Sequence, residues 1–137
     1  MTILEAAQAS AQGFTVTSNA GRRYTPDQLD VKWVGAHYAS MNNAGMTEAE
    51  RKGAWKMTHD LKLVQPYYDA VASGRKTFEV RKSDRPYTEG DYVNLREFDP
   101  NTGEYSGHSV LRRISYVLDE PAYVPEGCVI FGIVLPN

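Results

Sequence analysis

The residues best suited to chemistry lie in one short segment, residues 74–82. There a threonine, a glutamate and an arginine stand two positions apart (Thr77, Glu79, Arg81), with apolar residues between them. This alternation predicts a strand with polar side chains on one face and apolar side chains on the other. A carboxylate flanked by cations on a rigid strand can line a ligand pocket, where arginine binds phosphate or a base edge. The spacing fits equally an exposed salt-bridged strand of little energetic weight, so both interpretations stay open.

The basic character of this segment is local. The stretch from Gly74 to Arg85 contains five basic residues and two acidic ones (Arg75, Lys76, Arg81, Lys82 and Arg85; Glu79 and Asp84). The whole chain of 137 residues has a formal net charge of −2. Proteins that hold duplex DNA through many phosphates are usually basic over the binding domain. The sequence therefore disfavours a large non-specific duplex binder, but it allows a compact site with local positive charge.

The elements that position this segment fall into two parts, residues 1–57 and residues 58–137. Residues 1–23 are rich in small and polar residues and are expected to form a mobile or weakly helical tail. An amphipathic helix is predicted to begin at Thr25. A second short helix, ending at about Lys56, is predicted after Thr47, which forms a capping box with the glutamate three residues later. The first part is thus an N-terminal helical extension, which either packs on the second part or binds a partner.

The second part has a strand-rich pattern. The predicted elements are a strand at 59–64, a helix at 65–73, and strands at 76–82, 92–98, 105–118 and 128–135. Gly74 suits the left-handed end of the helix, and the segment 99–103 is a strong hairpin signal. The last strand is apolar at nearly every position and is expected to be buried on both faces. Several short strands with one short helix predict an α+β domain containing a small β-barrel.

Several classes of protein are disfavoured by what the sequence lacks. A single cysteine, Cys128, argues against a disulfide scaffold and against a cysteine zinc site. His59 and His108 belong to no metal-ligand spacing, so neither a metal nor a cofactor is expected. No run approaches the roughly 18 apolar residues of a membrane span, and the N-terminus does not read as a secretory signal. We therefore expect a cytoplasmic protein that does not contact membranes.

The charged segment and its surroundings resemble the ASCH superfamily, whose fold is a PUA-like β-barrel. The matching residues are His59-Asp60-Leu61-Lys62, Gly74-x-Lys76-x-x-Glu79-x-Arg81, Asp84-Arg85 and Gly90-Asp91. Over about residues 58–135 they are similar to small bacterial and phage ASCH-like proteins usually labelled RNA-binding by homology. The resemblance implies a small mixed PUA-like barrel with a short helix after its first strand.

The resemblance also implies a function, which is the binding of RNA, a nucleotide or a nucleoside. Unpaired or modified nucleotides would enter a cleft lined by a lysine, a glutamate and an arginine (Lys76, Glu79, Arg81). The further candidate ligand-binding residues are Lys82, Arg85 and Tyr67, with Tyr68, Tyr87 and Tyr92 as other stacking candidates. Stacking on aromatic side chains and contacts to base edges are the usual means of recognising unpaired RNA.

Two alternatives to a non-catalytic binding module remain. One ASCH branch removes the acetyl group from N4-acetylcytidine, and other members are described as ribonucleases. Lys76 falls at the lysine position of the amidohydrolase branch, but Glu79 occupies the position of its nucleophilic threonine. Thr77, beside the lysine, is then the nucleophile candidate, and Lys76 and Glu79 are the catalytic candidates. The second alternative is a phage protein-interaction factor that binds a protein partner through residues 1–57.

Overall fold

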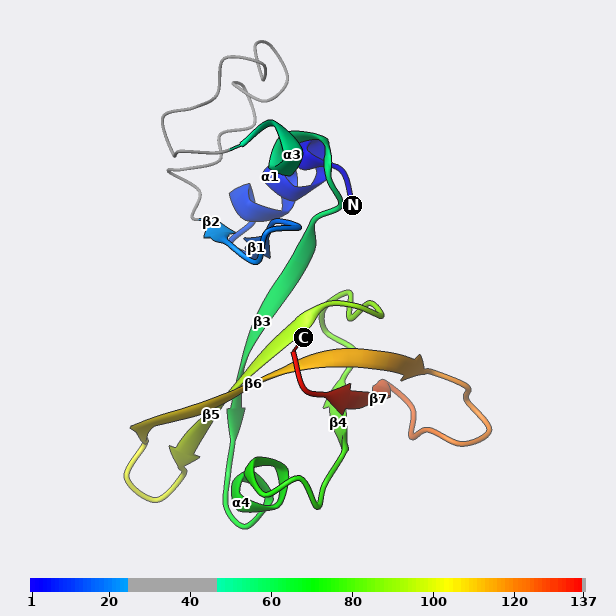
Figure 1. The fold of residues 1–137 in the computed structure, drawn as a ribbon. Helices are drawn as coiled ribbons and strands as arrows, with labels where there is room; N and C mark the ends of the chain where they lie inside the picture. Colours follow the sequence, from blue (N-terminus) through cyan, green and yellow to red (C-terminus); the bar gives the residue numbers. More distant parts are fainter. Residues whose placement is uncertain (25–46, 137) are drawn as a thin grey trace. The chain divides into compact units, whose positions relative to one another are not determined.

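The computed structural model describes residues 1–24 and 47–136 and divides the chain into two compact units, Met1–His59 and Asp60–Asn137 (Figure 1). The described elements are mixed α and β, with seven strands and short helices. The helix predicted to begin at Thr25 lies outside the described residues.

The first unit contains helix α1, strands β1 and β2, helix α3 and the start of strand β3 (Ile3–Ala11, Thr15–Thr17, Arg23–Tyr24, Glu48–Lys52 and Lys56–Leu63). Thr2 caps α1, since its side chain accepts the Glu5 N–H at 3.2 Å and the Glu5 carboxylate accepts the Thr2 N–H at 3.1 Å. Residues 1–23, expected to be a mobile or weakly helical tail, are in part helical, but α1 packs into a core cluster and is not a free tail. The alanines that suggested a tail form a close-packing face, and Ala6 and Ala7 are fully buried in one cluster with Trp55.

Helix α3 begins at the predicted capping box and contributes a buried carboxylate to this unit. The Thr47 hydroxyl accepts the Glu50 N–H at 3.1 Å, and the helix ends at Lys52, earlier than predicted. Glu50 accepts hydrogen bonds from Arg22 Nη1 at 3.1 Å and from the Tyr24 hydroxyl at 2.8 Å. Burial and this hydrogen bond to Glu50 raise the pKa of Tyr24 to about 12. Burial alone would raise the pKa of Glu50, but the hydrogen bonds and the Arg22 charge outweigh it and lower that pKa.

The second unit continues β3 and adds helix α4 and strands β4, β5, β6 and β7 (Tyr67–Ala72, Phe78–Lys82, Tyr92–Asp99, Glu104–Leu118 and Cys128–Val134). The strand order in this unit is β3-β5-β6-β7-β4. The pairs β5–β6, β6–β7 and β4–β7 are antiparallel. Gly74 follows α4 with a φ of +82°, and Gly103 closes the β5–β6 hairpin with a φ of +72°, as predicted.

The sheet of the second unit is not closed, so the predicted β-barrel is not supported. Strands β3 and β4 stand at opposite ends of the strand order, and in the described residues no backbone ladder joins them. A side chain spans this seam instead, because Arg81 Nη2 on β4 donates to the carbonyl oxygen of Lys62 on β3 at 2.8 Å. The α+β class holds, while closure depended on long-range strand pairing that local patterns do not determine.

On β4 the polar face is buried and the apolar face is exposed, which is the reverse of the usual arrangement. Glu79, on the polar face, is only 2% exposed, whereas Phe78 and Val80, on the apolar face, are nearly half exposed.

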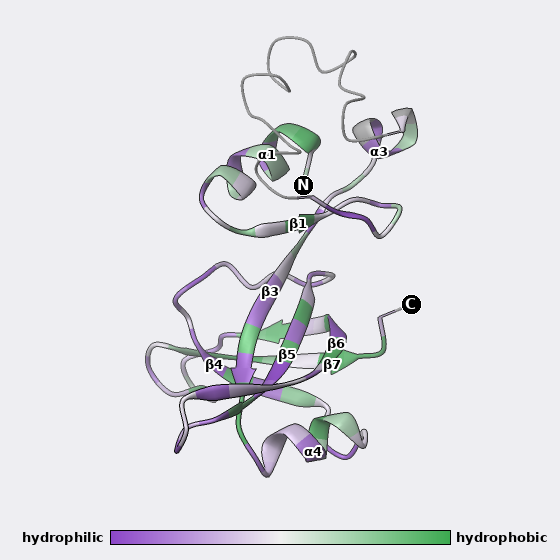
Figure 2. Cartoon of the chain, turned by 90° about the vertical axis from the view of Figure 1, so that its left-hand side faces the viewer, coloured by the Kyte–Doolittle hydropathy of each residue, from purple (hydrophilic) through white to green (hydrophobic). Residues whose placement is uncertain are grey.

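Strand β7 is coloured largely as hydrophobic in Figure 2, yet its burial alternates along the strand. Val129, Phe131 and Ile133 are buried, and the intervening residues are only partly covered or exposed. The expectation that this last strand is buried on both faces was therefore wrong.

Candidate nucleotide-binding site

The predicted trio converges on one buried carboxylate. Lys76 Nζ donates to Glu79 Oε1 at 2.5 Å and to the Phe78 carbonyl oxygen at 2.8 Å. Arg81 Nε and Nη2 both lie 2.9 Å from Glu79 Oε2. The side chains of Lys76 and Arg81 are 18% and 20% exposed, so each cation reaches solvent while the carboxylate between them does not.

This network fixes the position of Arg81. Its Nε and Nη2 groups are occupied by Glu79 and by the Lys62 carbonyl oxygen, which prevents the guanidinium from rotating. Among the described residues no acceptor contacts its Nη1 group, which keeps two donors for a ligand. An arginine held in this way loses little conformational entropy when it binds an anion.

A cavity of about 470 Å³ lies at the seam between β3 and β4. Four basic side chains contribute to its lining (Lys62, Arg81, Lys82 and Arg85). The acidic residues of the lining are Asp60 and Asp84, so basic groups outnumber acidic groups two to one. We call it the basic cavity; its volume is in the range of small-molecule sites.

Two tyrosines complete the lining of the basic cavity, Tyr87 and Tyr105. The ring of Tyr87 packs against Phe131, with the centroids 4.8 Å apart, and the Arg85 guanidinium lies over the Tyr87 ring, 6.0 Å from its centroid. Burial raises the pKa of Tyr87, so its hydroxyl stays protonated at neutral pH. Tyr105 is 39% exposed, and Arg96 lies over one face of its ring, 3.8 Å from the centroid, so a ligand can use only the part of the ring that Arg96 leaves uncovered.

Comparison with known proteins covers the region that contains this cavity. Residues 58–133, more than half of the chain, match a family model described as a domain of unknown function, DUF3850. The chain belongs to the DUF3850 family. A relative from Escherichia phage P2, described as an uncharacterized 12.9 kDa protein in the GpA 3′ region, is 36% identical over 81 residues, which cover 57% of this chain and 72% of that protein.

All lining residues of the basic cavity fall inside the DUF3850 domain. The structure places three predicted ligand-binding residues in its lining, namely Arg81, Lys82 and Arg85. Lys76 and Glu79 do not line it and instead hold Arg81 in place from within the fold. The resemblance to the ASCH superfamily stays a prediction.

Two predicted residues lie away from the basic cavity. Tyr67, on α4, is 53% exposed and is not part of the lining. Thr77 has an exposed side chain, and its backbone carbonyl accepts the Ile133 N–H at 2.9 Å. Neither residue therefore shares a recess with Arg81 in the way the predicted site required.

Sequence reasoning missed several residues of the lining, among them Asp60, Lys62 and Tyr105. Asp60 and Lys62 alternate with Leu61 on β3, and this alternation marked one polar face without showing what it faces. Tyr105 lies on β6, beside Phe98 of β5 in the strand register. No local signal links these positions to β4, since only the curvature of the sheet brings them together.

The described part of the chain gives no sign of a metal site. Within residues 1–24 and 47–136, no three His, Cys, Asp or Glu side chains gather as metal ligands would. Among the same residues, no helix has the length and apolar character needed to cross a bilayer.

Proposed function

We propose that the DUF3850 domain of this protein binds unpaired RNA or a nucleotide, with a phosphate group in the basic cavity. The observation that carries the proposal is the gathering of four basic side chains around one cavity in a chain whose net charge is negative. Charge concentrated in this way serves a local anionic ligand better than a long duplex.

The basic residues divide into one that two hydrogen-bond acceptors hold in place and others with loose ion pairs or none among the described side chains. Arg81 is held by Glu79 and by the Lys62 carbonyl oxygen, so its Nη1 donors are ready for a phosphate oxygen or a base edge. Lys82 is exposed and, among the described side chains, makes no ion pair. Arg85 has only a loose pair with Asp84, at 3.6 Å. Their charge is therefore free to act on a ligand.

The two tyrosines favour an unpaired nucleotide over a free phosphate ion. A base needs a flat apolar surface for stacking, and Tyr105 exposes such a surface beside the cations. In a duplex the bases are stacked on one another and not available to this ring. The cavity therefore suits a nucleotide whose phosphate contacts the cations and whose base contacts the aromatic wall.

A fluorescence-anisotropy titration with short labelled single-stranded RNA of mixed sequence at low salt tests the proposal. Lys82→Ala and Arg85→Ala are each expected to weaken binding about fivefold to tenfold, the effect of one lost phosphate contact. Arg75→Ala is the matched control, because Arg75 belongs to the same basic stretch of sequence but does not line the cavity. Absence of binding, or an equal loss in the Arg75 variant, contradicts the proposal.

The same samples separate binding from turnover. RNA recovered at full length and N4-acetylcytidine recovered unchanged leave binding as the activity of the domain. Shortened RNA, or released acetate, assigns the domain to the hydrolase alternative instead.

A further inference from the structure

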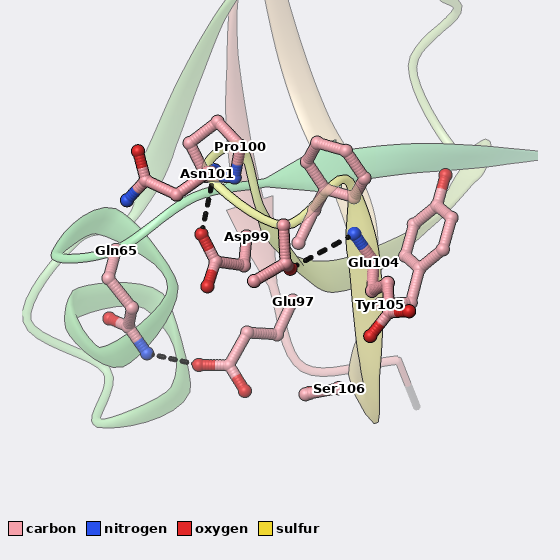
Figure 3. A pocket seen from close by; sticks show the side chains of 10 residues that line it. Gln65, Glu97, Asp99, Pro100, Asn101, Glu104, Tyr105 and Ser106 are labelled. Atoms are coloured by element: carbon pink, nitrogen blue, oxygen red, sulfur yellow. Dashed lines mark hydrogen bonds between the residues drawn. The ribbon is translucent and has the colours of Figure 1, made fainter.

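A second cavity, of about 530 Å³, lies at the β5–β6 hairpin (Figure 3). It has the opposite electrostatic character, because three carboxylates contribute to its lining (Glu97, Asp99, Glu104) and, among the described residues, the lining contains no lysine or arginine. Basic groups lie just behind the lining, since His108 Nδ1 is 3.9 Å from Glu97 Oε1 and the Arg96 guanidinium is 3.8 Å from the centroid of the Tyr105 ring. Gln65, just before α4, reaches it from the other side and points toward Glu97 in Figure 3. We call it the acidic cavity.

Tyr105 connects the two cavities, since it lines both of them. Its ring packs edge-on against Phe98 of the acidic cavity, with centroids 5.1 Å apart. Lys62 of the basic cavity in turn lies over the Phe98 ring, 4.5 Å from its centroid. Aromatic rings thus run from the basic cavity to the acidic one, and a bound strand can follow them.

The polar groups of the acidic cavity are held in place. Gln65 Nε2 donates to Asp69 at 2.9 Å and also to Glu97, and its carbonyl oxygen accepts the Asp69 N–H at 3.2 Å. Hydrogen bonds from Ser106 and Gln65 lower the pKa of Glu97, so its carboxylate is ionised at neutral pH. The cavity therefore presents fixed acceptors at a defined place.

Fixed carboxylates determine which part of a nucleotide fits. They repel a phosphate, so the acidic cavity is unsuited to the backbone of a strand. They accept hydrogen bonds from an exocyclic amino group, as in the pairing of Glu or Asp with cytosine N4. Uracil places a carbonyl oxygen at the position where cytosine has this amino group, and two acceptors would then face each other.

We infer that the acidic cavity is a base-binding subsite for an amino-bearing base such as cytosine, on an RNA strand whose neighbouring phosphate lies in the basic cavity. Tyr105 stacks on the strand between the two cavities, and Glu97 accepts the amino group. The inference rests on the proposed function and extends it from a single nucleotide to a strand of at least two nucleotides with a base preference.

Titration of the whole chain with end-labelled hexamers of cytidine and of uridine tests this inference. The two probes have the same length and charge and differ at the amino group. Wild type is expected to bind the cytidine hexamer about tenfold more tightly. Glu97→Gln is expected to reduce this preference to less than about threefold, mainly by weakening the binding of cytidine.

Two further variants separate a specific contact of Glu97 with the base from an effect of net charge and from an effect of stacking. Glu126→Gln removes the same charge from an exposed loop that lines neither cavity, and it should keep the full preference. Tyr105→Leu should weaken both hexamers to a similar degree, because stacking does not distinguish the two pyrimidines. Equal losses of preference in the Glu97 and Glu126 variants would show an effect of net charge and overturn the inference.

Failure of the subsite and failure of the proposed function give different results. Equal affinity for the two hexamers, with both weakened by Lys82→Ala, overturns the base-binding subsite and leaves the function of the basic cavity intact. No binding of either hexamer at low salt overturns both.

Discussion

The buried carboxylate of Glu79 fits neither simple interpretation of the charged strand. Glu79 does not line the basic cavity, and its ion pairs with Lys76 and Arg81 are not exposed on the surface. A carboxylate at 2% exposure loses its hydration, and both cations beside it are needed to replace the lost hydrogen bonds. Its two oxygens accept from different partners, Lys76 on one and Arg81 on the other. Glu79 thus positions Arg81 in this structure, and its predicted contact with a ligand stays a prediction.

Glu79→Gln should lower the free energy of unfolding by about 2 kcal/mol, because an amide NH₂ would then face a cation in a buried place. Urea denaturation measures the change. Asp84→Asn is the matched control, since it removes an exposed carboxylate 3.6 Å from Arg85 and should change stability by less than about 0.5 kcal/mol. Equal effects of the two substitutions would place Glu79 among ordinary surface pairs.

The carboxylate of Glu50 makes the first unit sensitive to acid. Its pKa is lowered in the folded state, so its contribution to stability is complete above the ordinary value of 4.5 and is lost as the pH falls through the folded pKa. Glu50→Gln should therefore be less stable than wild type at pH 7 and lose less stability between pH 5 and pH 3. Urea titrations followed by tryptophan fluorescence in a Trp33→Phe background, where Trp55 is the single tryptophan, report on this unit. Trp55 Nε1 donates to the Glu50 carbonyl oxygen at 3.0 Å. Parallel pH profiles for the two proteins would contradict the assignment.

At the scale of elements, β4 depends on the turn that precedes it. Helix α4 ends at Ala72, and Gly74 in the left-handed region redirects the chain so that the Lys76 N–H donates to the Ala70 carbonyl oxygen at 2.9 Å. This turn fixes the backbone position from which the Lys76 side chain reaches Glu79. The geometry of the charged network therefore rests on one backbone conformation.

Gly74→Ala should cost about 1 kcal/mol of stability. A Cβ there meets no atom within 4 Å, so the cost comes from the φ of +82° and not from a clash. Gly74→Asn is the control and should lose less, because asparagine tolerates the left-handed region. Thermal unfolding of the three proteins measures the order, and an alanine variant as stable as wild type would show that the turn adapts.

At the scale of the whole molecule, a net charge of −2 limits how RNA is held. In the described part of the chain, the basic cavity supplies a local excess of cations, because four basic residues line it. For single strands, each neutralised phosphate contributes about −0.7 to the slope of log affinity against log salt concentration.

The slope for a short single-stranded RNA should therefore be no steeper than about −3, and duplex DNA of equal length should bind more weakly. Anisotropy titrations at a series of potassium chloride concentrations measure it. A much steeper slope would mean that phosphates contact cations outside the basic cavity.

The amino-acid sequence by itself determined the elements of the second unit and their turns. Side-chain alternation predicted β4, β5 and β6, and the glycines at 74 and 103 marked the turns that the structure confirms. It also brought Glu79 and Arg81 together, because residues two positions apart on one strand point to the same face, and it placed Lys76 three positions before Glu79, just ahead of β4. These features depend on neighbours along the chain, where propensity and periodicity act.

Only the tertiary structure decided which face of β4 is buried, whether the sheet closes, and which residues share a cavity. Alternation shows that two faces differ, but packing against Phe131 and its neighbours placed the polar face of β4 inside. The basic cavity joins Lys62 of β3 to Arg85 across the ends of the strand order, and it needs Tyr105 from β6. Contacts between residues so far apart in the chain depend on strand pairing and sheet curvature, which the burial of the whole apolar core selects.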